Sequence, residues 1–301
     1  MNKLVFVALA AVGSLVGCQS ADQNIEKKLD DILAMKKDIA DIKAAIAKGG
    51  IGAGAQAQRP QRREPDRAKT YAVPIEGDAF DGPADAKVTL IKAYDYACPY
   101  CEKVRPTMEE LRQKYGNDLR IVSKQMVVHP NNAMAGALAF CAANLQGKAK
   151  QMDALVWDKG FKVRNLDNST VAAAPPAAMA EKGGAAAPPA NQKCWDTAEG
   201  CKNVVGYAQE IGLNVDQFKA DMKGKCEQLV QKDMSDLQKL GVGATPSFFI
   251  NGRFLSGAMP IENFSALIDE ELKKANERVQ QGTPAAQYYN QWVLAKGEKS
   301  I

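Results

Sequence analysis

Two cysteines separated by two residues are the feature of this 301-residue sequence that points most directly to chemistry. The motif is Cys98-Pro99-Tyr100-Cys101, and it follows an apolar run from Val88 to Tyr94 that predicts a buried strand. A helix predicted from about Cys101 to Tyr115 begins at the motif, so Cys98 lies at its N-terminus. Free backbone N–H groups and the helix dipole stabilise a thiolate there, and they lower the cysteine pKa below its ordinary value of about 8.5.

Cysteines in this arrangement are suited to thiol–disulfide exchange. In the predicted reaction Cys98 forms a mixed disulfide with a substrate sulfur, and Cys101, one helical turn further along, resolves it. Cys101 lies closer to the core and stays protonated until it is needed. Pro99 costs no helical hydrogen bond, because an N–H group in the first turn has no intrahelical acceptor. The reaction uses only cysteine sulfur, so the sequence predicts no cofactor.

A Cys-x-x-Cys pair is also half of a zinc site, and a structural zinc ion needs two further ligands at suitable spacing. Cys194 and Cys201 have six residues between them and no histidine nearby, which is a poor zinc pattern. The one histidine of the chain, His129, falls in a predicted loop. We therefore expect no metal and no histidine-dependent hydrolase. A Cys98–Cys101 bridge with a purely structural role is the remaining alternative.

The N-terminus predicts export. Lys3 precedes a short apolar run from Leu4 to Val16, which is too short for a comfortable membrane span. The run ends in Leu-Val-Gly-Cys18, which resembles a bacterial lipoprotein box, so residues 1–18 are interpreted as a lipoprotein signal peptide with Cys18 lipidated. An ordinary secretory signal is the alternative. Gln19 favours the outer membrane if the cell is Gram-negative, which predicts a lipid-anchored, periplasm-facing protein of the cell envelope.

If Cys18 is lipidated, six cysteines remain, and an even number in an exported protein indicates disulfide chemistry. Four of them lie outside the motif, and they allow three connectivities. Cys194 with Cys201 across a short loop, and Cys141 with Cys226 between helices, are the candidate pairs. We interpret all four as structural staples.

Composition limits the classes of partner. The chain is 46% hydrophobic and 25% charged, which is ordinary for one large or two modest globular domains. Its net charge is +4, and no basic block with interleaved aromatic residues occurs. The sequence therefore predicts no nucleic-acid partner.

Residues 19–48 predict a helical segment. Ile25, Ile32, Ile39 and Ile46 recur every seven residues, as the a positions of a coiled coil do. The apolar stripe of residues 21–48 either pairs with another subunit, which gives a homo-oligomer, or packs on the chain's own catalytic domain. Residues 49–70 are rich in Gly and Pro and predict a flexible linker.

Residues 71–282 predict the main α/β domain, and residues 283–301 a C-terminal tail whose aromatic residues dock on it. Predicted strands are Tyr71–Ile75, Val88–Tyr94, Leu119–Val128, and a hairpin of Ser247–Ile250 and Arg253–Leu255 around Asn251-Gly252. Residues 130–240 are mostly helical, with predicted helices Ala133–Leu145, Asn203–Gly212 and Val215–Leu240, and a last helix runs from Pro260 to Val279. The Ala- and Pro-rich residues 171–190 cannot bury a core, so we expect them to be disordered.

A second motif, Gly243 to Gly252, reads Gly-Ala-Thr-Pro-Ser-Phe-Phe-Ile-Asn-Gly. Together with Tyr-Ala-Cys-Pro-Tyr-Cys it resembles the thioredoxin superfamily, specifically the DsbA-like branch, which carries a helical insertion. The resemblance covers about Tyr71 to Val279 apart from the Ala/Pro stretch. It implies a thioredoxin fold with an inserted helical domain, a cis Pro246 that faces the cysteines, and a Thr245 backbone that pairs with an extended substrate peptide.

The direction of the reaction stays open at this level. The best-known oxidase of the branch has Pro-His between its cysteines, and the histidine helps to stabilise the thiolate; Tyr100 offers no such charge, and Asp95 and Glu102 would oppose the anion. We therefore expect a less acidic Cys98 than in that enzyme. The same dipeptide, with Thr245 before the proline, also resembles dimeric DsbG-like isomerases and reductases. The order of elements is DsbA-like, which leans slightly towards oxidase.

The resemblance implies exported cysteine-containing proteins as substrates and a membrane redox partner. A rival hypothesis from another class is a non-catalytic envelope lipoprotein, a holdase that binds partners through its coiled coil and inserted helices.

Overall fold

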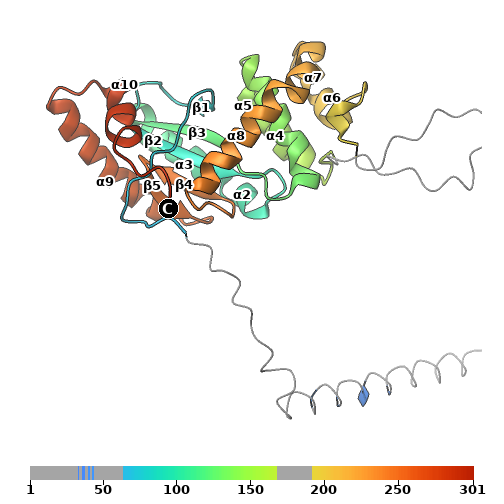
Figure 1. Ribbon diagram of the computed structural model, residues 1–301, viewed down its shortest axis with the longest axis horizontal. Coiled ribbons are helices and arrows are strands. Elements are labelled where there is room, and N and C mark those ends of the chain that lie inside the picture. Colours follow the sequence, from blue (N-terminus) through green and yellow to red (C-terminus); the bar gives the residue numbers. More distant parts are fainter. Residues whose placement is uncertain (1–32, 34–35, 38–39, 41–42, 44–63, 168–191) are drawn as a thin grey trace, which may run out of the picture. The chain divides into compact units, whose positions relative to one another are not determined.

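The structure is a computed structural model, and it describes residues 33, 36–37, 40, 43, 64–167 and 192–301 (Figure 1). The chain divides into two units, residues 1–61 and 62–301, and each is treated by itself. The five described residues of the first unit are helical and exposed. Cys18, the four isoleucines of the heptad pattern, residues 49–63 and the Ala/Pro stretch lie outside the described residues. No helix in the described part is long and apolar enough to cross a membrane.

The second unit is built on a five-stranded sheet in the order β1-β3-β2-β4-β5. Its strands are β1 (Ala79–Asp81), β2 (Val88–Tyr94), β3 (Leu119–Gln125), β4 (Ser247–Ile250) and β5 (Arg253–Ser256). β2 and β3 are parallel, and all other neighbours are antiparallel. β2 and β4 read as almost continuous apolar runs, because helices or turns cover both faces of the sheet.

The predicted β4–β5 hairpin is present, and Asn251 and Gly252 form its turn with φ values of 45° and 83°. Gly252 is required twice over: its φ is left-handed, and a Cβ there would lie 2.5 Å from the Tyr71 carbonyl oxygen. The Asn251 side chain accepts a hydrogen bond from the Thr89 N–H at 2.8 Å and donates one to the Lys87 carbonyl, which ties the turn to β2.

Alternating side chains of the sheet feed two apolar layers. On one face Leu90 and Phe248 pack with α3 (Arg105–Tyr115) and α9 (Ile261–Gln280). On the other face Ile91 and Phe249 pack with the end of α8 (Lys225–Lys239), α10 (Ala285–Tyr288) and the π-helical turn η4 (Tyr289–Leu294). The predicted docking of the tail takes this form, and the Tyr289 hydroxyl donates to the Val73 carbonyl at 2.7 Å.

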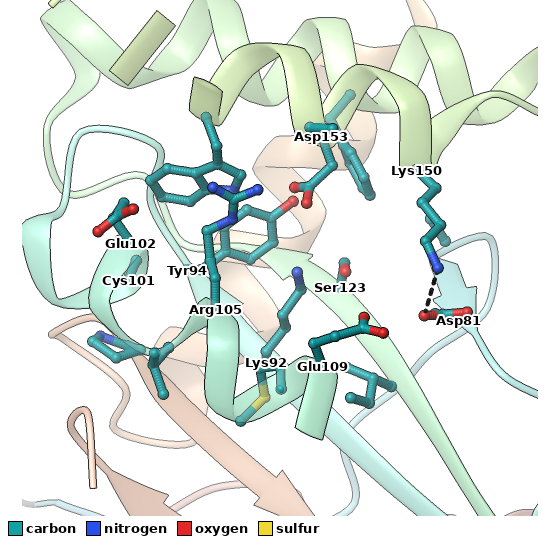
Figure 2. A pocket seen from close by; sticks show the side chains of 18 of the residues that line it. Asp81, Lys92, Tyr94, Cys101, Glu102, Arg105, Glu109, Ser123, Lys150 and Asp153 are labelled. Carbon is teal, nitrogen blue, oxygen red and sulfur yellow. Dashed lines mark hydrogen bonds and ion pairs between the residues drawn. The ribbon is translucent and has the colours of Figure 1, made fainter. Parts of the chain in front are cut away.

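The residues between β3 and β4 form an inserted helical layer, which Figure 1 shows at the opposite end of the unit from α9. Its helices are α4 (Pro130–Leu145), α5 (Ala149–Leu155), η2 (Val156–Phe161), η3 (Cys194–Asp196), α6 (Lys202–Glu210), α7 (Val215–Lys223) and α8. One disulfide, Cys141–Cys226, joins α4 to α8, and the other, Cys194–Cys201, joins η3 to the start of α6. Between the insertion and the sheet lies a cavity (Figure 2).

The predicted first strand, Tyr71–Ile75, is wrong. Tyr71 forms only an isolated bridge with Glu298, and the first strand of the sheet is β1. The backbone of this segment instead bonds the C-terminal residues and the hairpin turn: Ala72 N–H donates to the Glu298 carbonyl and Tyr71 N–H to the Gly252 carbonyl. Pro74 has no N–H with which to continue a ladder.

Two predicted helices are each divided into two. The helix predicted from Cys101 to Tyr115 is α2 (Pro99–Lys103) followed by α3, because Pro106 has no N–H for the next helical bond. The helix predicted from Val215 to Leu240 breaks at Gly224, which ends α7 and precedes α8. The predicted third strand also ends earlier, at Gln125 rather than Val128.

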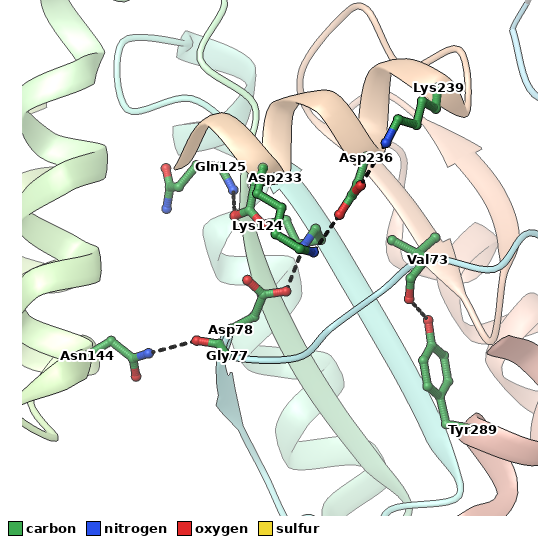
Figure 3. A network of polar contacts seen from close by, with 11 residues as sticks. Val73, Gly77, Asp78, Lys124, Gln125, Asn144, Asp233, Asp236, Lys239 and Tyr289 are labelled. Atoms are coloured by element: carbon green, nitrogen blue, oxygen red, sulfur yellow. Dashed lines mark hydrogen bonds and ion pairs between the residues drawn. The ribbon is translucent and has the colours of Figure 1, made fainter. Parts of the chain in front are cut away.

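A buried ion cluster ties the insertion to the sheet (Figure 3). Lys124 of β3 is 1% exposed, and its Nζ lies 2.7 Å from Asp78, before β1, and 2.5 Å from Asp233 of α8. The second carboxylate oxygen of Asp233 accepts the Gln125 N–H at 3.0 Å. Burial, followed by the Asp233 charge, raises the pKa of Asp78 to about 7.

We predict that Lys124→Met lowers the free energy of unfolding by about 3–5 kcal/mol, because it leaves two buried carboxylates without their cation. Urea unfolding at neutral pH measures the change. Lys232→Met is the matched control: Lys232 is exposed on the same α8 helix and pairs with Asp236, so we expect a loss of no more than about 1 kcal/mol. Equal effects of the two substitutions would contradict the cluster's role.

We also predict that this cluster makes stability depend on pH. Asp78 binds its proton more tightly in the folded protein, with a pKa of about 7, than in the unfolded chain, where the pKa is about 4. The folded state therefore holds more protons in this window, and the cluster's contribution to stability falls as pH rises from about 4 to about 7. Asp78→Asn removes this component, so its unfolding free energy changes less than that of wild type across the window. Asp81→Asn, on the exposed β1 edge, should follow wild type; parallel profiles for Asp78→Asn and wild type would refute the prediction.

Candidate active site

The Cys-x-x-Cys motif lies where β2 ends and α2 begins. The Cys98 N–H donates to the Asp95 carbonyl at 3.1 Å, which closes the turn between them, and Cys98 is the N-cap of α2. Cys98 and Cys101 are both free thiols and both buried, whereas Tyr100 between them is 62% exposed. The motif therefore presents one aromatic side chain to solvent above two largely covered sulfurs.

The second motif lies beside the first because of strand register. β4 pairs antiparallel with β2, with Ala93 opposite Ser247. The residues before Ser247 therefore come next to the residues after Ala93. The Thr245–Pro246 peptide bond is cis, and the Cys98 Sγ lies 3.3 Å from the Thr245 carbonyl oxygen. The structure thus brings together Cys98, Cys101, Thr245 and Pro246, as the resemblance implied.

The two thiols have opposite acidities. A hydrogen bond from Cys101 is the largest of the effects that lower the pKa of Cys98 to about 5, and burial opposes it. Further lowering comes from Thr245 and from the backbone N–H groups of Cys101 and Tyr100. Burial strongly raises the pKa of Cys101, and its proximity to Cys98 raises it further. Cys98 is the group that ionises at neutral pH, and Cys101 is the proton donor that stabilises it.

Thr245 contributes more than its backbone. Its hydroxyl oxygen is buried and has no hydrogen-bond partner among the described residues. The Cys98 sulfur bonds the Thr245 carbonyl as a thiol, and the Thr245 hydroxyl is near enough to lower the Cys98 pKa. A hydroxyl with no other acceptor can turn its hydrogen to the sulfur when the thiolate forms.

Asp95 holds the turn before the motif in place. It is fully buried, and its carboxylate accepts three backbone N–H groups: Ala97 at 2.6 Å, Val128 at 2.6 Å and His129 at 2.7 Å. The His129 Nδ1 lies 3.2 Å away. The sequence suggested that the Asp95 charge opposes the thiolate. In the structure the Asp95 carboxylate instead accepts hydrogen bonds from backbone N–H groups. The signal available was its short side chain directly after a strand, which favours such local bonds.

The cavity of Figure 2 reaches the cysteine site at Cys101. Its volume is about 470 Å³, and Cys101 and Pro246 form part of its wall. Lys92 of β2 and Asp153 of α5 also line it. Sequence reasoning missed these two; the available signal was Lys92, the one charged residue in the β2 run Val-Thr-Leu-Ile-Lys-Ala-Tyr.

The four other cysteines lie in the insertion, in two bonds whose pairs are those named from the sequence. They do not join the Cys98 site. No group of three or more His, Cys, Asp and Glu side chains in the described part of the chain could hold a metal ion.

We predict that the Cys98 thiolate titrates with a midpoint at about pH 5 in the reduced protein. Its ultraviolet absorbance measures the titration. Cys101→Ala should raise the midpoint, because it removes the donor with the largest effect, whereas Cys101→Ser retains a hydroxyl donor and should raise it less. A midpoint near that of free cysteine, or equal midpoints in both variants, would contradict this account. Cys98→Ser serves as the blank.

Comparison with known proteins agrees with this geometry. The thioredoxin family, described as Thioredoxin, matches residues 75–270. The structure of oxidised BdbD from Bacillus subtilis is 19% identical with a TM-score of 0.50, and the alignment covers 70% of this chain and 100% of that one.

Among curated proteins, the Na(+)/H(+) antiporter NhaA of Herminiimonas arsenicoxydans is 26% identical over 216 residues, or 71% of this chain. NhaA 1 of Salinispora arenicola is 28% identical over 204 residues, or 65% of this chain. The chain spans only 29% and 25% of these two relatives, so the transport they are named for belongs to the longer proteins.

The fold predicted from the two motifs is confirmed by the sheet order, by the helical layer inserted between β3 and β4, and by a family match that covers more than half of the chain. The protein belongs to the thioredoxin family, in a form that carries an inserted helical domain.

Proposed function

We propose that this protein catalyses thiol–disulfide exchange on exported proteins and works mainly as an oxidase. The observation that carries the proposal is the pair of free thiols with opposite acidities beside Thr245 and Pro246. A low-pKa cysteine next to a buried, protonated partner is what exchange through a mixed disulfide requires.

In the oxidising direction a substrate thiolate attacks the Cys98 sulfur of the Cys98–Cys101 disulfide. The Cys98–Cys101 bond breaks, and Cys101 leaves and takes up a proton. A second substrate thiolate then attacks the substrate sulfur of the mixed disulfide, and Cys98 leaves as a thiolate. Two electrons pass from the substrate dithiol to the cysteine pair.

The low pKa of Cys98 supports the oxidising direction. A thiolate that is stable at neutral pH is a good leaving group, and it stabilises the reduced enzyme relative to the disulfide. Both effects favour release of an oxidised substrate. The lowered pKa arises from Cys101, Thr245 and backbone N–H groups rather than from a histidine in the motif, so Tyr100 does not preclude this direction.

Substrate contact is assigned to the exposed surface around Tyr100 and to the backbone at Thr245. We propose that an extended peptide lies along Thr245, which places its cysteine next to Cys98. In this proposal Cys18 anchors the protein by lipid in the cell envelope, residues 21–48 form an oligomer, and a membrane redox partner reoxidises Cys101 and Cys98.

We predict that the wild-type protein oxidises reduced ribonuclease with glutathione disulfide as terminal oxidant, and that Cys98→Ser lowers the rate by at least about 100-fold. Cys101→Ser should also lose most of the oxidation rate, because it cannot form the Cys98–Cys101 disulfide that the substrate thiolate attacks. We expect a reduction potential above the value of about −270 mV for thioredoxin. The control is a variant at an exposed position of α7, Lys223→Met, which should retain full activity.

Different failures separate the alternatives. Insulin reduction without ribonuclease oxidation would overturn the oxidase direction but keep exchange. Activity on scrambled ribonuclease by a dimer would favour the DsbG-like reading. Unchanged function in Cys98→Ser, with function lost on removal of residues 21–48, would favour a non-catalytic holdase.

A further inference from the structure

The cavity beside the cysteine pair has the size and walls of a ligand site. Its volume of about 470 Å³ lies within the range of about 300–1,000 Å³ usual for small-molecule pockets. β1, β2 and β3 form one wall, α3 a second, and α5 with η2 a third. Much of the cavity lining is apolar or aromatic and consists of Tyr94, Met108, Ile121, Phe140, Trp157 and Phe248.

Most of the charged groups that line the cavity already have partners. Arg105 pairs with Asp158 at 3.1 Å, and Lys150 with Asp81 at 3.3 Å, where Arg112 also lies 3.9 Å away. Lys162 is 3.0 Å from Asp158 and 3.9 Å from Glu102.

The two remaining carboxylates are also engaged. Asp153 accepts the Tyr96 hydroxyl at 2.7 Å, and Glu109 accepts the Gln113 amide at 3.2 Å. Asp153 is therefore a fixed negative charge on the α5 wall of the cavity, and it limits where a second anion can lie.

Lys92 is the exception. Its Nζ lies 4.5 Å from the centre of the Tyr94 ring, and within residues 64–167 and 192–301 it makes no ion pair. Figure 2 shows its ammonium group directed into the cavity, with Asp153 on the far wall and Glu109 to one side. A partly buried cation over an aromatic face, with solvent space in front of it, is poised to bind an anion.

A second hydrogen-bond donor in the cavity wall also lacks a partner in the described part of the chain. Trp157 lines the cavity, and its indole N–H is buried without an acceptor among the described residues. A buried N–H that stays unpaired costs about 1–3 kcal/mol, so an acceptor is expected for it. The Arg105 guanidinium lies over this ring, 5.5 Å from the ring centre, which helps to hold the indole in place.

We propose that this cavity binds a small organic monocarboxylate with an apolar or aromatic body. Its carboxylate pairs with Lys92, and its body packs against Tyr94, Phe140 and Trp157. Because Cys101 and Pro246 both line the cavity, a bound ligand lies next to the cysteine site. The proposal does not depend on the direction of the redox reaction, or on the protein being an exchange enzyme.

The test is calorimetric titration of the full-length reduced protein with 3-phenylpropionate, and with 3-phenylpropanamide as the uncharged match. We expect the carboxylate to bind at least about tenfold more tightly than the amide, which corresponds to about 1.4 kcal/mol. Inorganic phosphate, which has charge but no apolar body, should bind more weakly than the carboxylate. Equal binding of acid and amide, or tighter binding of phosphate, overturns the proposal, as does failure of both organic compounds to bind at millimolar concentration.

Two variants are expected to change carboxylate binding in opposite directions. Lys92→Met should weaken carboxylate binding at least about tenfold, whereas Lys92→Arg, which keeps the charge, should retain most of it. Asp153→Asn removes the facing negative charge while retaining an acceptor for the Tyr96 hydroxyl, so it should tighten binding. Lys223→Met on α7 is the matched control and should bind as wild type does. Unchanged binding in Lys92→Met, or weaker binding in a folded Asp153→Asn, overturns the assignment to this cavity.

Discussion

The antiparallel pairing of β4 with β2 is the contact on which the site depends. Ala93 and Ser247 are opposite one another in the register, so the loop before β4 and the turn after β2 meet at the same end of the sheet. A slip of one residue would turn Phe248 and Phe249 to the wrong faces and break both apolar layers. The register that the core requires is therefore the same register that brings Thr245 to Cys98. Packing of the apolar layers thus fixes the positions of the site residues.

Two buried charged residues, Asp95 and Lys124, also hold elements of the fold in their relative positions. Asp95 is buried at the end of β2 and binds backbone N–H groups on both sides, so the turn that carries Cys98 is joined to the loop after β3. Lys124 performs a comparable task at the insertion, where it links β3 to α8 and to the segment before β1 (Figure 3). A buried charge is tolerable only with its partners, so each of these groups specifies one arrangement of elements around it.

The acidity of the site follows from these positions and not from charged neighbours. Cys101, Thr245 and backbone N–H groups all lower the pKa of Cys98, whereas burial dominates at Cys101 and raises its pKa. One sulfur is thereby prepared to leave or attack, and the other to hold a proton. Cys101 also lies on the wall of the cavity that contains Lys92, so the two sides of the cysteine pair meet different chemical environments.

The sequence alone determined the features that depend on near neighbours. Cys98 to Cys101 at a strand–helix junction, the Asn251-Gly252 turn and the apolar runs of β2 and β4 are local patterns with local causes. The resemblance added Pro246 as the partner of Cys98, and the fold followed from the two motifs together. Tyr71–Ile75 has the composition of a strand, but only the packed C-terminal residues show where its hydrogen bonds go. Lys124 meets Asp78 and Asp233 across separations of 46 and 109 residues, and no spacing rule anticipates either contact. The cavity of Lys92 and Asp153 likewise exists only once the insertion packs on the sheet, because an empty space has no sequence signal and is defined by the tertiary structure around it.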